Sequence, residues 1–425
     1  MTRAQAQILP AGVRIFRYTN EIKQLIVAIM MNKLTEFYDV VVVGAGMTGA
    51  AAALGFAQEG MKVALLEKAK PVEFDANSTP DVRISAISSA SIELLKQLGA
   101  WKHVEAMRSV PYCELETWEE PGSNVIFDAK SLGLPELGFM VENRVLQLAL
   151  WRECEQYSNL ELVCPATLVN LYQPHGQKHW MVELEDGRVL ETKLVVGADG
   201  ANSQVRKMAG IGSRGWQYRQ SCMLITIQTN QPQQDRTWQQ FFPSGPRAFL
   251  PLYDNWASLV WYDSPAKIRR LQSMSMEQLT GAITEAFPER LGEVKAIASG
   301  AFPLTRHHAS RYVLDGLVLI GDAAHTINPL AGQGVNLGYR DVDVLLKVIY
   351  QARECVEAWE SLDVLKRYQR RRLPDNLMMQ AGMDVFYMAF SENLPGLKML
   401  RNFGLMAAQR AGEAKKLALK YALGL

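Results

Sequence analysis

A glycine-rich turn between a strand and a helix constrains the fold of this chain most. Residues 38–43 (YDVVVV) form a β-branched run that is typical of a strand buried in a parallel sheet. Gly44-x-Gly46-x-x-Gly49 follows at once, and residues 50–60 predict an alanine-rich helix. A second strand is predicted over residues 62–67, and it ends in Glu67. A strand, turn, helix and strand in this order are the fingerprint of a dinucleotide-binding βαβ unit.

Each position of this motif has a physical role in holding a dinucleotide. Gly44 permits a tight turn, and Gly46 lets the backbone approach a pyrophosphate at the helix N-terminus, where free N–H groups attract anions. Gly49 permits close packing of the helix on the strand, and Glu67 would accept hydrogen bonds from an adenosine ribose. The alternative is a glycine turn in an ordinary α/β protein. We favour the nucleotide site because all its parts stand in the expected order.

Two later strands end in glycine and aspartate. The strand predicted over residues 194–197 leads to Asp199 and Gly200, and Asp199 would lie where the strand meets the ligand crevice. Capping of the following helix explains the same aspartate equally well. The strand predicted over residues 317–320 leads to Asp322, whose carboxylate could bind the hydroxyls of a sugar chain.

The segment after Asp322 is the most specific stretch of the sequence. Residues 329–334 (PLAGQG) predict a loop, and a helix is expected to begin near Gln333. The N-terminus of that helix would stabilise a negative charge over the loop, such as that of a reduced flavin. The candidate cofactor contacts in this segment are Pro329, Gly332, Gln333, Gly334 and Asn336.

The other polar residues give weaker indications. Arg83 could reach a phosphate or the ribityl chain of a cofactor, or it could be a surface arginine. His325 is more readily a structural residue that bonds the backbone than a proton carrier, so it is only a weak candidate for catalysis. His307 and His308 lack metal-ligand spacing and are expected at the surface or in packing. Five scattered cysteines contain no CxxC pair. We therefore expect no metal, and the catalytic residues remain unknown.

The predicted elements suggest a nucleotide-binding sheet built from separated pieces, with a β-rich domain threaded between them. The discontinuous cofactor domain would comprise residues 37–111, 191–215 and 301–350. The β-rich substrate domain would comprise residues 112–190 and 216–300, followed by a helical region over residues 351–425. Residues 1–36 are expected to be a disordered extension, and Met31 is a plausible natural start. The junction of the two domains is a favoured place for a ligand.

Charge and hydrophobicity exclude several classes of function. The 45 basic and 44 acidic residues leave a net charge of +1, which argues against a nucleic-acid partner. The 48% of hydrophobic residues and 21% of charged ones are ordinary for a globular protein. No stretch reaches the roughly 18–20 apolar residues that span a bilayer. We expect a cytoplasmic protein.

These motifs, in this order and spacing, resemble those of the flavoprotein aromatic hydroxylases of the p-hydroxybenzoate hydroxylase type over about residues 38–425. A narrower resemblance is to the FAD-dependent hydroxylases of ubiquinone biosynthesis, and among them to the demethoxyubiquinol hydroxylases. It rests on the stretches Met140–Asn143, Trp238–Phe241, Arg247–Leu252, Asp254–Asp263 and Leu417–Leu425. Residues 1–30 depart from this pattern.

The resemblance implies a fold, cofactors and a reaction. The fold would be α/β, with a Rossmann-like FAD-binding domain interleaved with a β-sheet substrate domain and a helical C-terminus. FAD would be bound by Gly44, Gly46, Gly49, Glu67, Arg83, Asp199, Asp322 and residues 329–334, and Gly200 would support the approach of NAD(P)H. NAD(P)H and O2 would yield a flavin C4a-hydroperoxide that hydroxylates a prenylated benzoquinol. The alternatives are another ring position, another phenol, or a non-catalytic flavoprotein scaffold of the biosynthetic complex.

The C-terminal segment has the composition of a basic amphipathic helix. Lys398, Arg401, Arg410, Lys415, Lys416 and Lys420 stand against one acidic residue, Glu413, and apolar residues lie between them. Such a helix can lie on an anionic membrane surface, or it can pack on the core with a solvated basic face. The prenylated substrate that the resemblance implies favours membrane contact, at the inner face of the cytoplasmic membrane.

Overall fold

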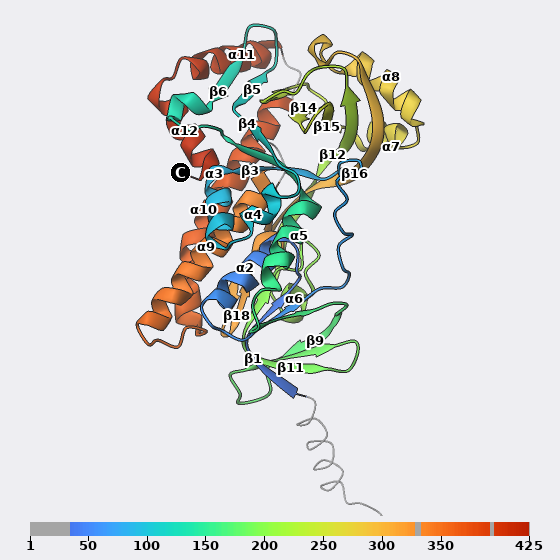
Figure 1. Cartoon of the computed structure of the whole chain (residues 1–425). Coiled ribbons are helices and arrows are strands. Elements are labelled where there is room, and N and C mark those ends of the chain that lie inside the picture. Colours follow the sequence, from blue (N-terminus) through green and yellow to red (C-terminus); the bar gives the residue numbers. More distant parts are fainter. Residues whose placement is uncertain (1–34, 328–332, 392–394, 425) are drawn as a thin grey trace, which may run out of the picture.

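The first sheet carries the predicted nucleotide-binding unit at its centre. In the computed structural model, which describes residues 35–327, 333–391 and 395–424, the strands β18, β11, β1, β2 and β8 lie side by side and parallel (Figure 1). Their bounds are β1 Thr35–Val43, β2 Val63–Leu66, β8 Leu160–Val163, β11 Val189–Gly197 and β18 Leu317–Leu319. Val40, Val41 and Val42 of β1 are fully buried, as the β-branched run predicts for a strand inside a parallel sheet.

Three helices cover this sheet beside the glycine turn. Helix α2 (Met47–Gln58) contacts β1 and β2, and it is flanked by α5 (Asn143–Cys154) and α9 (Gln333–Glu354). The alanines of α2 are almost completely buried, because their short side chains let neighbouring helices approach closely. The predicted βαβ unit is therefore present, and its helix is the most enclosed one of the domain.

The second sheet forms the upper half of the molecule in Figure 1. Its strand order is β19-β16-β12-β15-β14-β13-β5-β6, antiparallel except for the pair β13 and β5. Two long strands dominate it, β12 (Ser213–Thr229) and β16 (Val294–Ala309). The shorter strands are β5 Glu114–Trp118, β6 Val125–Asp128, β13 Arg236–Gln240, β14 Arg247–Pro251, β15 Trp256–Asp263 and β19 His325–Thr326.

Side chains of β12 alternate between two hydrophobic clusters. Met223, Ile225 and Ile227 pack with residues of α7 (Pro265–Gln272) and α8 (Met276–Ala286), whereas Cys222 and Leu224 belong to the cluster that includes side chains of α10. This period of two is the expected behaviour of a strand with one side chain up and the next one down. The face away from α7 and α8 is therefore the face of the second sheet that meets helix α10 (Leu362–Ser391).

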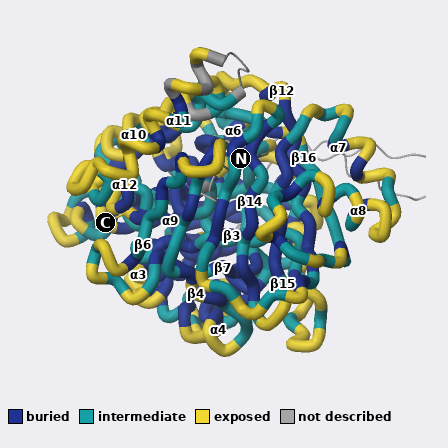
Figure 2. The backbone as a smooth tube through the Cα atoms, turned by 90° about the horizontal axis from the view of Figure 1, so that it is seen from above, coloured by how far each residue is buried: buried dark blue, intermediate teal, exposed yellow. Residues whose placement is uncertain are grey.

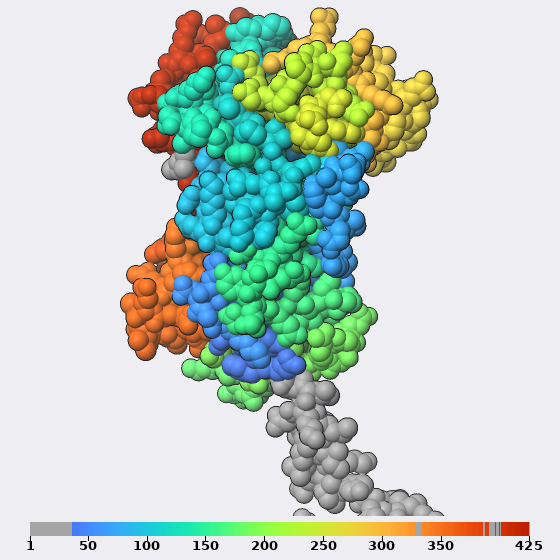
Figure 3. All heavy atoms as spheres, in the orientation of Figure 1, coloured from blue at the N-terminus to red at the C-terminus, as the bar shows by residue number. Residues whose placement is uncertain are grey.

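A small sheet lies between the two large sheets, and further α-helices complete the described structure. The small sheet has the order β3-β7-β4, with β3 Ile84–Ser88, β7 Gly138–Glu142 and β4 Val110–Tyr112. Figure 2 shows buried backbone along β3 and β7 and exposed backbone at the rim. In the space-filling view, the chain around residues 90–110 lies between the halves that contain the two large sheets (Figure 3). The remaining helices are α3 Ser89–Gln97, α4 Trp101–Glu105, α6 Gln204–Met208, α11 Pro395–Gln409 and α12 Glu413–Leu423.

The predicted fold class and helical C-terminus agree with this architecture, but one part of the chain lies elsewhere than expected. Residues 112–190 were assigned to the substrate domain, yet α5 packs on α2 and β8 pairs with β2 in the first sheet. Strand β10 (Trp180–Leu184) pairs antiparallel with β11 in the same sheet, and β9 (Leu168–Tyr172) pairs antiparallel with β10. Alternation indicates a half-buried strand but not the sheet to which it belongs. The other domain bounds stay a proposal, and residues 1–34 of the expected extension lie outside the described residues.

Candidate functional site

The glycine turn leaves open space in front of helix α2. Gly44 has a φ of +100°, and a Cβ there would lie 2.6 Å from the carbonyl oxygen of Ala198. A Cβ on Gly49 would lie 1.9 Å from the carbonyl oxygen of Gly44, so helix and strand are in direct contact. A Cβ on Gly46 would meet nothing within 4 Å in the described parts of the chain. This arrangement fits a pyrophosphate at Gly46, a contact that stays a prediction.

The turn is held by groups from two distant elements. Glu67, at the end of β2, accepts hydrogen bonds from the backbone N–H of Ala45 at 2.8 Å and of Lys68 at 2.8 Å. On α5, Trp151 Nε1 and Gln147 Nε2 donate to the carbonyl oxygen of Ala45 at 2.8 and 2.9 Å. Sequence reasoning missed both α5 residues, because they lie about a hundred positions away and no local motif marks them. Glu67 lies where a ribose would reach it, and its ribose contact stays a prediction.

Asp199 performs the capping role that the sequence left open. Its Oδ2 accepts from the backbone N–H of Gln204 at 2.6 Å and of Val205 at 3.1 Å, at the start of α6. Its Oδ1 is buried and has no hydrogen-bond partner within residues 35–327, 333–391 and 395–424. Gly200 adopts a φ of +78° with open space at its Cβ position among the described atoms. The carboxylate therefore caps α6 with one oxygen and leaves the other for a ligand.

Asp322 combines exposure to solvent with a crowded protein environment around its carboxyl group. The residue is exposed to solvent, and yet burial raises the pKa of its carboxyl, while the charges of His325 and Arg83 pull that pKa down. A carboxyl group with both properties is surrounded by protein on most sides but still reached by water. Arg83 is exposed, with its Cζ 6.0 Å from the ring centroid of Phe302. The structure thus brings Arg83 and Asp322 into one electrostatic neighbourhood, although they are far apart in the sequence.

The histidines are structural, but with other partners than expected. His325 is 2% exposed, and its Nε2 lies 2.6 Å from Asp341 Oδ2, so its side chain bonds a carboxylate rather than the backbone. His307 and His308 are half-buried rather than at the surface. Burial lowers the pKa of each to about 4, helped by the positive charge of Arg206 for His307 and of His325 for His308. His307 and His308 are therefore neutral packing residues near pH 7.

The segment predicted as a cofactor loop is described in part. Pro329 and Gly332 lie outside the described residues, whereas Gln333 and Gly334 begin helix α9, where the sequence placed the helix start. The amide of Asn336 is completely buried. Its Oδ1 accepts from the backbone N–H of Ser88 at 3.0 Å and from Ser91 Oγ at 2.8 Å, and its Nδ2 donates to the carbonyl oxygen of Ala86 at 2.8 Å. The Asn336 side chain therefore holds β3 and α3, and its predicted contact with the cofactor stays a prediction.

The predicted cofactor residues converge on one edge of the first sheet. The glycine turn, Glu67, Asp199 and Asp322 follow the carboxyl ends of β1, β2, β11 and β18, which are neighbours in the sheet. In open α/β sheets, ligands bind in the crevice outside these strand ends. A free helix N-terminus suits a pyrophosphate, and an accessible carboxylate suits the hydroxyls of a sugar chain. The groups at this edge of the sheet therefore fit FAD.

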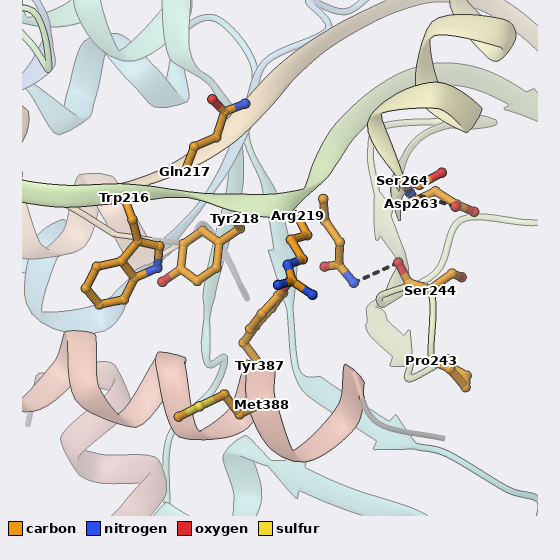
Figure 4. A pocket seen from close by; sticks show the side chains of 11 residues that line it. Trp216, Gln217, Tyr218, Arg219, Pro243, Ser244, Asp263, Ser264, Tyr387 and Met388 are labelled. Carbon is orange, nitrogen blue, oxygen red and sulfur yellow. Dashed lines mark hydrogen bonds between the residues drawn. The ribbon is translucent and has the colours of Figure 1, made fainter. Parts of the chain in front are cut away.

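A separate cavity of about 520 Å³ lies between β12 and α10 (Figure 4). Trp216, Tyr218 and Arg219 of β12 point toward Tyr387 and Met388 of α10 in this view. The predicted cofactor residues do not line this cavity in the described structure. It lies instead at the junction between the second sheet and the C-terminal helices.

Known proteins share both the sequence and the fold. Residues 37–379 match the family described as "FAD binding domain". The chain is 60% identical over 396 residues to the 3-demethoxyubiquinol 3-hydroxylase of Escherichia coli K12, covering 93% of this chain and all of that protein. It is 34% identical to the mitochondrial ubiquinone biosynthesis monooxygenase COQ6 of Danio rerio, over 91% of this chain and 90% of that one.

Among solved structures, the p-nitrophenol 4-monooxygenase of Pseudomonas putida DLL-E4 superposes with a TM-score of 0.76 at 19% identity, over 91% of this chain and 98% of that one. At this identity the likeness concerns the fold alone. The sequence matches, in contrast, extend through both large sheets and the cofactor site. The chain therefore belongs to the FAD-dependent monooxygenases of ubiquinone biosynthesis, with FAD as its cofactor.

Proposed function

We propose that this protein hydroxylates 3-demethoxyubiquinol, a prenylated benzoquinol, with NAD(P)H as electron donor and O2 as co-substrate. The observation that carries the proposal is the 60% identity to the E. coli 3-demethoxyubiquinol 3-hydroxylase over the whole of that protein. The identity includes the second sheet, and the residues of a substrate domain decide which phenol is accepted. The 34% identity to COQ6 supports the family but not this substrate.

Bound FAD supplies the redox chemistry, and the chain holds it and shapes its surroundings. The N-terminus of α2 at Gly46 would hold the pyrophosphate, and Asp322 would bind the hydroxyls of the ribityl chain. The N-terminus of α9, at Gln333, places positive partial charge at the end of the cofactor loop. The second sheet would shield the flavin from water and orient the ring of the quinol. The group that removes the proton of the quinol hydroxyl remains unassigned.

Quinone profiling tests the substrate. Cells that lack the gene should accumulate demethoxyubiquinone and make little ubiquinone, and the gene should restore ubiquinone when it is returned. Accumulation of a precursor that lacks an earlier ring oxygen would favour hydroxylation at another position. A purified yellow protein that does not consume NAD(P)H and O2 with the quinol would favour a non-catalytic scaffold of the biosynthetic complex.

We further propose that the isoprenoid tail leaves along helix α10 toward the cavity at β12. Met379 packs with Ile327 and Leu337 beside the cofactor loop, and Met383 contacts that cluster and the one under the second sheet. Tyr387 follows one turn later and lines the cavity. Each CH₂ that is buried along this path contributes about 0.8 kcal/mol. Met383→Glu should raise KM for a long-tailed quinol and leave that for a tail-less analogue unchanged.

The C-terminal helices support a proposal of membrane contact. On α11, Arg401 bonds the buried Glu119, with its Nε 3.2 Å from Glu119 Oε2, so this face of the helix is turned inward. Met399, Phe403 and Met406 are 79%, 70% and 42% exposed. Their spacing of four and three residues places them on one helix face. An apolar stripe that faces water on a helix held from behind marks an interaction surface.

The charge beside this stripe favours an anionic bilayer as the partner. The exposed Arg410 ends the stripe, and α12 adds three lysines and the 70% exposed Leu417. No helix within the described ranges is long and apolar enough to cross a membrane. We propose that the stripe enters the interface of the inner face of the cytoplasmic membrane while the basic residues contact lipid phosphates. Association with other enzymes of the pathway also stays a proposal, and we assign no separate surface to it.

Vesicle binding tests the membrane proposal. The protein should sediment with vesicles that contain anionic phosphatidylglycerol and much less with phosphatidylcholine alone, and salt should weaken the binding. Phe403→Glu should abolish the binding. Met276→Glu is the matched control, because Met276 is 38% exposed on the distant helix α8. Equal binding of the two variants would show that the stripe is not the contact.

A further inference from the structure

A buried carboxylate joins the three segments that meet behind the cofactor loop. Asp341, on α9, is completely buried. Its Oδ2 accepts from the backbone N–H of Gly321 at 2.9 Å and lies 2.6 Å from His325 Nε2. Its Oδ1 accepts from Arg372 Nε at 2.7 Å and from Asn376 Nδ2 at 3.3 Å, both on α10. One side chain therefore ties the turn after β18 to both long C-terminal helices.

The two partners of Asp341 Oδ2 flank Asp322, the residue predicted to bind the cofactor. Gly321 directly precedes Asp322, and His325 follows it by three positions, so Asp341 grips both ends of the short segment that carries the Asp322 carboxylate. Asp341 itself is buried, whereas Asp322 is exposed to solvent. Asp341 therefore acts on a ligand only through the position of Asp322.

The ion pairs make this grip strong and particular to a carboxylate. Burial alone would raise the pKa of Asp341, but His325 and Arg372 together hold it well below the ordinary value, so the group stays ionised. A buried carboxylate that accepts four hydrogen bonds cannot be replaced by an amide without loss of some of them. The amide N–H groups would point at one or more hydrogen-bond donors, which they cannot pair with. Packing of α9 against α10 alone would not require an ionised carboxylate at this position.

We propose that Asp341 is the positioning residue of the cofactor site, setting the Asp322 carboxylate against the ribityl hydroxyls of FAD. This rests on the predicted role of Asp322 and not on the identity of the quinol. Asn336, on the first turns of the same helix, holds the backbone of β3, the strand that follows Arg83. Helix α9 thereby fixes two cofactor segments, one through Asn336 and the other through Asp341.

A double-mutant cycle on FAD affinity tests the proposal. FAD release on dilution of the holoprotein, followed by flavin fluorescence, gives the Kd of each variant, and thermal unfolding reports stability separately. Asp322→Asn should weaken FAD binding about tenfold, as the loss of a hydrogen bond to a charged group does. Asp341→Asn should weaken it by a similar factor. The double variant should bind FAD as Asp322→Asn does, within about twofold, because Asp341 has nothing left to position.

The matched control is Asp343→Asn, two residues along α9, where a partly exposed carboxylate pairs with Lys347 at 2.8 Å. It should leave the FAD affinity unchanged. A merely structural Asp341 would lower the unfolding temperature but leave the Kd unchanged, or would change the Kd by the same factor with and without Asp322. Either result, or an unchanged Kd for Asp322→Asn, overturns the proposal.

Two variants of His325 test the same positioning role if Asp341→Asn does not fold. His325→Ala removes one of the two grips on the Asp322 segment and should weaken FAD binding only while Asp322 is present. His325→Gln keeps an N–H donor toward Asp341 and should restore part of the affinity. If both variants bind FAD as tightly as the parent protein, Asp341 does not position the segment.

Discussion

The Gly46→Val substitution should abolish FAD binding while the protein still folds. Gly46 caps α2 with a φ of −69° and a ψ of −176°, which any residue can adopt, and its Cβ position is open among the described atoms. Loss of a favourable cap residue costs about 1 kcal/mol. In a protein of 425 residues, that lowers the unfolding temperature by only about 1 °C, because the unfolding entropy grows with chain length.

The effect on FAD is much larger, because the new side chain would occupy the place of the pyrophosphate. Two hydrogen bonds to a charged group contribute about 1.5–3 kcal/mol each, so their loss amounts to about 3–6 kcal/mol. This corresponds to an affinity loss of about 100-fold or more. The purified variant should be colourless at the parent's yield, with unfolding close to that of the parent stripped of FAD.

Gly49→Ala provides the contrast. A Cβ at Gly49 would lie 1.9 Å from the carbonyl oxygen of Gly44, so α2 must shift away from β1 and the fold itself should suffer. Flavin absorbance at about 450 nm per protein and thermal unfolding separate the two outcomes. A yellow Gly46→Val variant with the parent's Kd for FAD would refute the reasoning that the pyrophosphate lies at this turn.

Three further predictions follow from other parts of the structure. A chain that begins at Met31 should keep its fold, FAD and activity, because β1 begins only at Thr35; loss of soluble protein would show that the preceding residues are needed. Arg401→Ala should destabilise the protein by about 3–5 kcal/mol, since Glu119 is left as a buried charge, and chemical denaturation measures this. His307 and His308 have folded-state pKa values of about 4, below the ordinary 6.5, so the unfolded chain binds more protons between these values and stability falls as the pH drops from 7 to 5. The loss should be about 1 kcal/mol per histidine after allowance for solvent screening, and replacing both by glutamine should flatten the dependence of unfolding temperature on pH.

The sequence predicts those parts of the site that depend on local backbone geometry. The turn at Gly44, the packing at Gly49 and the start of α9 at Gln333 all depend on neighbours within a few residues, and the structure has them where the pattern placed them. Asp199 was ambiguous because a helix cap and a ligand contact require the same residue type. The structure shows that one carboxylate oxygen caps α6, while the other has no hydrogen-bond partner among the described residues, so its ligand contact stays a prediction.

What the sequence could not predict depends on contacts between distant positions. Trp151 and Ala45 are 106 residues apart, and Asn336 bonds Ser88 across 248 positions. Neither side chain stands in a local pattern that names its partner. Asn336 was assigned to the cofactor because it stands in the most specific stretch of the sequence, but its amide is used to hold β3. Specific motifs therefore contain residues that build the site as well as residues that touch its ligand.

Helix α10 connects the two halves of the site. About three turns into the helix Arg372 bonds Asp341, and two turns later Met379 packs beside the start of α9. Met383 then reaches the cluster beneath β12, and Tyr387 contacts Tyr218 at a ring-centroid distance of 4.8 Å. A rise of about 1.5 Å per residue makes the distance from Arg372 to Tyr387 about 22 Å. Because one continuous helix contacts both ends, a tilt of α10 moves the second sheet and the Asp341 contacts together. The position of the second sheet relative to the predicted FAD site therefore depends on α10, a helix that carries no cofactor motif.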